Sequence, residues 1–370
     1  MEFYIYKSIF VVISFVVMLS VGAYATLAER KFAGFFQDRH GPERAGWYGL
    51  LQPVADGVKF FFKEYFVPAE ADRFLFTLGP AIAMIVACMT SAVIPFGPEI
   101  TLPAFSLSLP IFGDISMAST TFALQATDLD IGVLYISGVV SVGVYGLMIG
   151  GWASNNKYSL LGAIRASSQM ISYEIGMGIA LITIIMMSGS MSAMKIVESQ
   201  SGYLYGIIPI KGFDWNIFYQ PLGFLIFCTC AFAECNRTPF DLPECEQELV
   251  GGYHTEYSSM GLGLYMFSEY FNMYVSGAFM ATLYFGGFNF PGMEYFEGSW
   301  LLPVLCVATM LTKILLFIFL FMWVRWTIPR FRYDQLMNIG WKVLMPLAIA
   351  NMLVTGVVLL IKDGNFTWPF

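Results

Sequence analysis

The chain has 370 residues, of which 57% are hydrophobic and 12% are charged, and its mean hydropathy is positive. Soluble domains carry about twice this charged fraction. The composition therefore excludes an ordinary soluble protein and indicates a helical protein that crosses the membrane several times. The formal net charge of −7 says little about partners, because the charges are unevenly spread, and no nucleic acid is expected among them.

Eight apolar stretches are long enough, or nearly so, to cross about 30 Å of hydrocarbon at 1.5 Å per residue. The first stretch is too long for a cleaved signal sequence. The expected fold class is all-α, with residues 1–370 forming one integral-membrane domain. The spanning segments are predicted at residues 3–28, 74–95, 131–152, 166–188, 217–235, 263–286, 302–324 and 341–361.

Basic residues predict how the segments are oriented. Most of the 19 Lys and Arg residues lie in the connections 29–73, 153–165, 236–262 and 325–342, and the connections between these are nearly free of bases. Bases favour the inner side of a membrane, so both termini are expected on the outer side. No internal repeat is evident, which disfavours a transporter built from inverted repeats.

The first inner connection is predicted to contain an amphipathic helix at about residues 45–66. Apolar residues recur at helical spacing on one side, and polar residues occupy the other. A helix of this kind lies along the membrane surface. A plain membrane anchor is the alternative, but an anchor does not require the charges of Asp56 and Lys59 in its middle.

Several charged residues fall within or at the ends of apolar segments. Glu174 follows Arg165 by nine residues, about 13 Å along a helix, and Lys313 is near the centre of its segment. Such depth costs about 2.5 kcal/mol or more, so these groups should face protein or water. Glu234 ends the fifth segment and Glu269 begins the sixth. One interpretation is structural pairing of Glu174 or Glu269 with Lys313 or Arg165; the other is a proton relay.

The stretch "AFAECNRTPFDLPECEQELVGGYHTEY" concentrates negative charge in one inner connection, at about residues 234–262. Apolar and chain-bending residues separate the acids, so we expect this stretch to fold back against the helices. Arg237, its only base, is expected to hold two or more neighbouring carboxylates and so fix the loop. The acids are Glu234, Asp241, Glu244, Glu246, Glu248 and Glu256.

Four of the six cysteines, Cys228, Cys230, Cys235 and Cys245, cluster near the same stretch. An iron–sulfur or zinc site is one interpretation. Cys228 and Cys230 are two residues apart and would point to different faces of a helix. Small buried apolar side chains are therefore favoured, and no metal site is expected.

Three long motifs carry a family resemblance. They are "LAERKFAGFFQDRHGPERAGWYGLLQPVADGVKFFFKEYFVP", "AFAECNRTPFDLPECEQELVGGYHTEY" and "WVRWTIPRFRYDQLMNIGWKVLMP". These closely resemble the signature regions of the membrane H subunit of respiratory complex I, called chain 1 in mitochondria, and the likeness runs through all eight segments. It implies a non-redox subunit of a proton-pumping NADH:quinone oxidoreductase in the bacterial inner (plasma) membrane, or in the mitochondrial inner membrane if the chain is organellar.

The resemblance also implies a substrate, partners and sites. The substrate would be a lipid quinone, with NADH, FMN and iron–sulfur clusters held only by partner subunits. The partners would be quinone-module subunits of the hydrophilic arm, small membrane subunits and antiporter-like subunits, within the lipid bilayer. No redox residue is assigned to this chain. The implied quinone tunnel involves Arg30, Trp47, Asp56, Lys59, Phe62 and Arg237. The implied proton route involves Asp56, Glu174, Glu234, Asp241, Glu244, Glu246, Glu256 and Glu269.

Two other classes of protein compete with this interpretation. The related membrane subunit of a group 4 hydrogenase has the same ancestry without a quinone, but the intact first two motifs argue against it. A stand-alone ion transporter is disfavoured because no repeat supplies two alternating halves. The sequence leaves open which quinone is used and whether sodium replaces protons.

Overall fold

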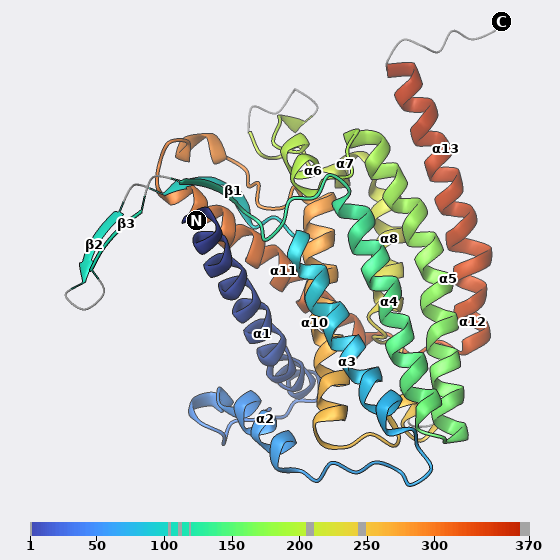
Figure 1. Cartoon of the computed structure of the whole chain (residues 1–370). Helices are drawn as coiled ribbons and strands as arrows, with labels where there is room; N and C mark the ends of the chain where they lie inside the picture. The colour runs from blue at the N-terminus through green and yellow to red at the C-terminus, as the bar shows by residue number, and fades with distance from the viewer. Residues whose placement is uncertain are drawn as a thin grey trace, which may run out of the picture.

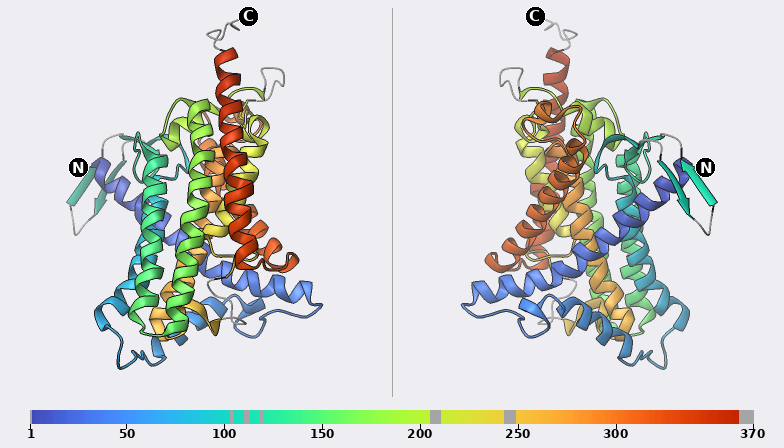
Figure 2. Two further views of the ribbon diagram at one scale, coloured as in Figure 1. Left: turned by 90° about the vertical axis from the view of Figure 1, so that its right-hand side faces the viewer. Right: turned by 90° about the vertical axis from the view of Figure 1, so that its left-hand side faces the viewer.

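The computed structural model describes residues 2–102, 105–109, 113–117, 120–204, 211–242 and 249–362. Figure 1 shows long helices packed side by side in one bundle, with α2 (Gln52–Phe62) lying across one end. Both termini lie toward the opposite end, as the turned views of Figure 2 also show. We call these two ends the α2 end and the far end. That both termini lie on the outer side of a membrane remains a prediction.

Six helical segments are long and apolar enough to cross a membrane. They are α1 (Glu2–Phe36), α3 with its 3-10 extension (Arg73–Val93), α4 (Gly132–Ala153), α5 (Lys157–Ser188), α11 (Leu301–Thr327) and the last segment (Tyr333–Lys362). The 26-residue α10 (Ser259–Tyr284) and the pair formed by α7 (Asn216–Tyr219) and α8 (Pro221–Glu234) complete the eight predicted segments. The all-α, multi-pass membrane fold is thereby confirmed.

The predicted segment 217–235 is interrupted. The helix breaks at Gln220, directly before Pro221, and α8 then runs for 14 residues, about 21 Å at 1.5 Å per residue. Proline has no backbone N–H, which suits it to the first turn of a new helix. The short α8 ends inside the bundle, so its last residue, Glu234, shares cavities with Val140 of α4 and Asn272 of α10.

The amphipathic helix is shorter than predicted. In place of one helix at about 45–66, a 3-10 turn at Trp47–Gly49 precedes the 11-residue α2. Gly46 and Gly49 have positive φ angles of 74° and 79°. This backbone conformation is incompatible with a right-handed helix, so residues 46–49 do not join α2. Beyond Phe62 the chain is extended at Lys63.

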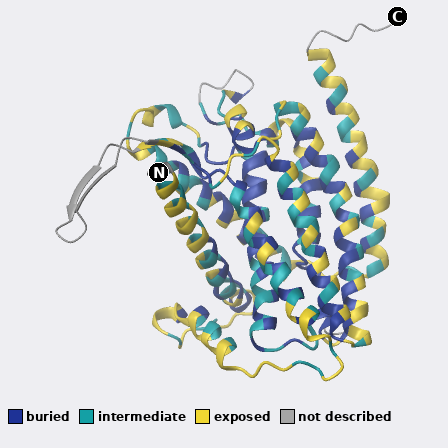
Figure 3. Ribbon diagram, in the orientation of Figure 1, coloured by how far each residue is buried: buried dark blue, intermediate teal, exposed yellow. Residues whose placement is uncertain are grey.

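Glycines allow the closest contact between α3 and α4. A Cβ atom on Gly79 would meet the Cα of Gly150 at 2.9 Å and the carbonyl of Gly146 at 3.0 Å. Small residues commonly bring membrane helices together in this way. The hydroxyl of Tyr265 on α10 donates to the Gly146 carbonyl over 3.0 Å, which joins a third helix to the pair. Figure 3 shows buried residues concentrated in these inner helices and exposed residues along α1 and α13 (Met345–Lys362).

The connection between α3 and α4 forms antiparallel ribbons at the far end. Strand β1 (Gly97–Leu102) pairs with β4 (Thr120–Leu124), with Ile100 opposite Phe122. Strand β2 (Phe105–Leu109) pairs with β3 (Gly113–Met117), and Figure 1 shows this second ribbon projecting away from the bundle. These strands were not predicted from the sequence.

Short elements complete the chain. A π-helical turn, η6 (Ile339–Leu344), joins α12 (Tyr333–Asn338) to α13, whose second residue is Pro346. A proline cannot donate the usual helical hydrogen bond, which accounts for a local change of winding. The remaining elements are η2 (Ser91–Val93), α6 (Ala193–Ser199), η4 (Gly252–His254) and η5 (Met293–Phe296).

Candidate functional site

Arg237 lies at the centre of a buried cluster of charges. Its guanidinium is 3.3 Å from a carboxylate oxygen of Glu29 and 3.7 Å from one of Glu269. These three residues are each at most 7% exposed. Both carboxylates come from other helices, α1 and α10, so Arg237 ties the acidic stretch to the bundle. A buried charge is tolerated when it is paired and hydrogen-bonded in this way.

Two tyrosines and a second arginine complete what we call the Arg237 cluster. The hydroxyl of Tyr270 donates to Glu29 over 2.8 Å, and that of Tyr253 donates to Glu269 over 3.1 Å. The guanidinium of Arg237 also lies 4.4 Å from the centre of the Tyr270 ring. Arg325 of α11 forms an ion pair with Glu29. Each carboxylate therefore accepts a hydrogen bond from a tyrosine hydroxyl and also faces a cation.

The sequence analysis did not single out Glu29 or Arg325. Glu29 follows a long apolar stretch and directly precedes two bases, a pattern that also fits the polar boundary of a membrane segment. Helix α1 continues to Phe36, so Glu29 lies seven residues before its end and packs against α10 and α11. The sequence did contain one indication: no helix-breaking residue separates Glu29 from the apolar stretch before it. The helix could therefore be expected to continue through Glu29.

The acidic stretch folds into the bundle where the structure describes it. Residues 236–241 are all buried, as the apolar residues among the acids led us to expect. Asp241 pairs with Arg330 over 2.8 Å. Glu256 accepts a 2.6 Å hydrogen bond from the amide of Asn156, the residue that caps α5. The predicted proton-route residues Glu244 and Glu246 lie outside the described residues, as does Cys245.

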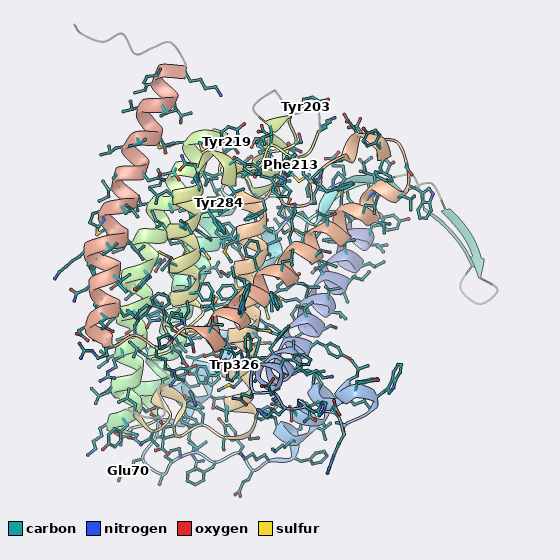
Figure 4. All side chains as sticks on the ribbon, turned by 180° about the vertical axis from the view of Figure 1, so that it is seen from behind. Glu70, Tyr203, Phe213, Tyr219, Tyr284 and Trp326 are labelled. Carbon is teal, nitrogen blue, oxygen red and sulfur yellow. The ribbon has the colours of Figure 1, made fainter. Side chains whose placement is uncertain are left out.

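Two cavities border the Arg237 cluster at the α2 end. One, of about 130 Å³, lies between α1, α2 and α10 and is lined by Arg30, Asp56 and Tyr270 among others. The other, of about 600 Å³, lies between α1, the chain after it and α11; its lining includes Glu29, Arg30, Tyr270 and Trp326. Figure 4 shows Trp326 near this end, whereas Tyr203, Phe213 and Tyr219 gather at the far end.

Besides Arg237, which lies in the buried cluster, the predicted tunnel residues divide into two groups. Arg30 and Asp56 meet in a 2.6 Å ion pair that joins α1 to α2, and both line the smaller cavity. Trp47, Lys59 and Phe62 are exposed on the outer surface of the α2 region instead, Phe62 to 87%. Their apolar neighbours give α2 a face suited to the membrane surface.

Glu234 and Glu174 lie further along the bundle. Glu234 is half-buried because it faces two internal cavities, of about 40 and 30 Å³. Glu269 lines the second of these as well, so one cavity connects the Arg237 cluster to Glu234. Glu174 of α5 accepts a hydrogen bond from the hydroxyl of Ser141 on α4.

Lys313 is paired with neither of the acids that the structural interpretation offered it. Its ammonium donates to the carbonyls of Phe285, Gly287 and Asn289 over 2.6 to 2.7 Å, at the cap of α10 and in the turn that follows it. It also lies 4.8 Å from the ring centre of Trp215. A carbonyl at a helix end, such as that of Phe285, lacks a partner within the helix and carries partial negative charge. Sequence alone gave no sign of them as partners.

The cysteines of the acidic region pack with apolar side chains. Cys230 and Cys235 are buried and Cys228 is half-buried, and all three are free thiols. Across the described ranges, no group of three or more His, Cys, Asp or Glu side chains is placed to hold a metal ion.

The fold and the site define a class of protein: a multi-pass helical membrane protein with a buried, multi-helix ion-pair network between cavities. Comparison with known proteins gives the family. A family model described as NADH dehydrogenase matches residues 8–356. The chain is 55% identical over 364 residues to the H subunit of NADH-quinone oxidoreductase from Flavobacterium johnsoniae, covering 98% of this chain and 97% of that protein.

Other relatives agree. The chain is 56% identical to the H 1 subunit of NADH-quinone oxidoreductase from Cytophaga hutchinsonii, over 97% of this chain and 98% of the relative. It is 45% identical to NADH-quinone oxidoreductase subunit 8 of Rhodothermus marinus, over 91% and 92%. The chain belongs to the family of H subunits of NADH-quinone oxidoreductase, which are membrane subunits of complex I. It is therefore a subunit of an enzyme complex and assembles with other subunits of that complex.

Proposed function

We propose that this subunit forms the entrance for a lipid quinone and the start of a proton route, and so couples quinone reduction to proton translocation. The observation that carries the proposal is the position of the Arg237 cluster between two sets of cavities. Glu29 and Tyr270 border the cavities at the α2 end, and Glu269 borders the cavity that reaches Glu234. Because Arg237 faces both Glu29 and Glu269, a change of charge on one carboxylate would alter the electrostatic environment of the other.

The proposed quinone entrance is supported by the cavity between α1, α2 and α10. A quinone has two carbonyl oxygens that accept hydrogen bonds and a long apolar tail. Arg30 supplies N–H donors, and Phe60, Met266 and Phe267 supply an apolar wall. The exposed apolar residues of α2 would place the mouth of the cavity at the membrane surface.

The proposed proton route is supported by carboxylates that line, or lie close to, cavities large enough for water. Glu269, Glu234 and Glu174 are acids in partly dry surroundings, each next to a hydroxyl or a cavity. A carboxylate in reach of such a partner can both accept and release a proton, which is what a relay requires. Asp241, Glu256 and the undescribed acids Glu244 and Glu246 would admit protons to this route.

This chain would carry no redox group. Electrons would reach the quinone from NADH through FMN and iron–sulfur clusters in partner subunits. The partners would include quinone-module, small membrane and antiporter-like subunits. The named relatives are bacterial, so we place the protein in the bacterial inner (plasma) membrane. Their names contain quinone, which favours this function over that of a hydrogenase subunit.

Glu174 provides the test. Glu174→Gln keeps the size and the hydrogen bond to Ser141 but cannot carry a proton, whereas Glu174→Asp keeps the acid. We expect the Gln variant to assemble yet lose most NADH-driven quinone reduction and proton uptake in vesicles, and Asp to retain more. Complex content on native gels controls for assembly. A well-assembled Gln variant that pumps normally would contradict the proton route.

A further inference from the structure

Two internal cavities meet at Asn272, in the middle of α10. The cavity next to the Arg237 cluster is lined by Glu269, Asn272 and Glu234 among others, and the next one by Glu234, Asn272 and Ser276. Both are therefore bounded by Asn272 and Glu234. At about 30 and 40 Å³, each has room for at least one water molecule with several polar partners.

The polar residues of α10 form a stripe along these cavities. Glu269, Asn272 and Ser276 are three and four residues apart, so they lie on one face of the helix. At 1.5 Å per residue, Asn272 is about 4.5 Å along the helix from Glu269 and about 6 Å from Ser276. The stripe thus runs from the Arg237 cluster toward the middle of the bundle.

The second cavity leads toward Glu174. Ser137 of α4 lines it, and the hydroxyl of Ser141, one turn further along, donates to the carbonyl of Ser137 over 2.9 Å. The same Ser141 hydroxyl contacts Glu174. Helix α4 therefore presents one serine to the cavity that Glu234 lines and, one turn away, a second serine to Glu174.

The Asn272 amide is free to bind something in these cavities. Within the described ranges, it makes no hydrogen bond to another residue, and the Glu234 carboxylate accepts none. Asn272 is half-buried, whereas the fully buried Asn216 and Asn289 each donate to a backbone carbonyl over 2.7 to 2.8 Å. A polar group inside a protein almost always has a partner, and bound water commonly supplies it.

We infer that Asn272 positions the water through which protons pass between Glu269 and Glu234. This inference rests on the proposed function and adds a residue to it. The amide N–H groups donate to the water or to a carboxylate, and the amide oxygen accepts from the water. Protonated Glu269 gives its proton to the water, which passes another to the Glu234 carboxylate, so the water is unchanged. The amide itself does not ionise; Asn272 is a positioning residue.

The experiment uses the intact complex with Asn272→Leu, which keeps the approximate size and removes all hydrogen bonding. We expect NADH-driven quinone reduction and proton uptake to fall together by about 10- to 100-fold, at or below the lower limit for loss of a proton-transferring group. Electron transfer from NADH to a hydrophilic acceptor that draws electrons upstream of the quinone should not change. The residual rate should show a larger solvent deuterium isotope effect, which a purely structural defect would not produce.

Three companion variants make the result decisive. Asn272→Asp retains the size and acceptor oxygens and should keep most of the activity. Thr282→Val removes a polar group of the same helix that bonds only its own turn, and should change nothing. If Asn272→Leu does not assemble, Asn272→Val, which is apolar and no larger than asparagine, is measured in the same way.

Glu234→Gln, measured in parallel, separates this inference from the proposed function. If Glu234→Gln stops pumping and an assembled apolar Asn272 variant pumps normally, the role of Asn272 is overturned and the proton route stands. An assembled apolar variant that is slow, but without an increased isotope effect and without rescue by Asp, also overturns it. If Glu234→Gln pumps normally, the route through Glu234 fails, and the role of Asn272 fails with it.

Discussion

Two cations are buried in this bundle, and their surroundings differ. Arg237, 5% exposed, lies between the carboxylates of Glu29 and Glu269. Lys313, 9% exposed, lies among three backbone carbonyls. Each also lies close to an aromatic ring, Tyr270 for Arg237 and Trp215 for Lys313. Both positions offset the cost of burying a charge.

The difference lies in what the partners can do. A carbonyl cannot gain or lose a proton, and three carbonyls satisfy all three donors of an ammonium group. The surroundings of Lys313 are thus fixed, and they hold the end of α10 against α11. Carboxylates do change charge, and those around Arg237 border cavities. A buried cation serves in one place to hold the fold and in the other, on our proposal, to link groups that titrate.

The largest effect is expected from Arg237→Met. It leaves Glu29 and Glu269 buried without their shared cation, and breaking a buried pair costs about 3–5 kcal/mol. We expect the complex to be nearly absent from native gels. Arg332→Met, which removes an arginine whose pair with Asp334 is mostly exposed, is the control and should assemble normally. Near-normal quinone reduction by a fully assembled Arg237→Met complex would contradict the importance of the cluster.

Lys313→Met should destabilise the fold without changing the chemistry. An unsatisfied buried hydrogen-bonding group costs about 1–3 kcal/mol, and the freed carbonyls would relax partly toward one another. We expect a lower unfolding temperature of the detergent-solubilised complex. The turnover of each assembled complex, and its ratio of protons to electrons, should stay normal. A loss of coupling in stable complexes would show that Lys313 is also part of the proton route.

Arg30→Met tests a cation whose side chain is exposed. Its pair with Asp56 joins α1 to α2 beside the smaller cavity, and such partly exposed pairs are worth about 0.2–1 kcal/mol. We expect normal assembly and a severalfold rise in the apparent KM for quinone, with unchanged activity toward an upstream hydrophilic acceptor. Lys59→Met, at an exposed position outside that cavity lining, should have the weaker effect on KM. An equal loss of both activities would make Arg30 structural.

The smallest effect is expected from Lys211→Met at the far end. Lys211 pairs with Glu297 over 2.6 Å, and this hydrogen bond raises the pKa of the lysine above its ordinary value. Exposed pairs contribute at most about 1 kcal/mol, because water screens them. Stability and quinone reduction should therefore match the unaltered complex within error. A large defect would indicate that Lys211 contacts a neighbouring protein of the complex.

Much of the fold follows from hydrophobic periodicity and length. The predicted segments at 131–152 and 302–324 agree with α4 and α11 to within a few residues, because a membrane demands long apolar helices whatever surrounds them. The break before α8 and the late start of α2 were not predicted. Both depend on single backbone positions, Pro221 and the left-handed Gly49, whose effect on the path of the chain is local.

The sequence by itself determined which charges are out of place in an apolar chain: Glu174, Glu234, Arg237, Glu269 and Lys313. Transfer of a charge from water into hydrocarbon is so unfavourable that such residues are recognisable without a structure. Only the tertiary structure decided their partners. Glu29 is 208 residues from Arg237, and Lys313 bonds carbonyls, which every residue possesses and which no sequence pattern distinguishes. Pairing depends on which helices pack together and at what depth, and that is a property of the assembled bundle.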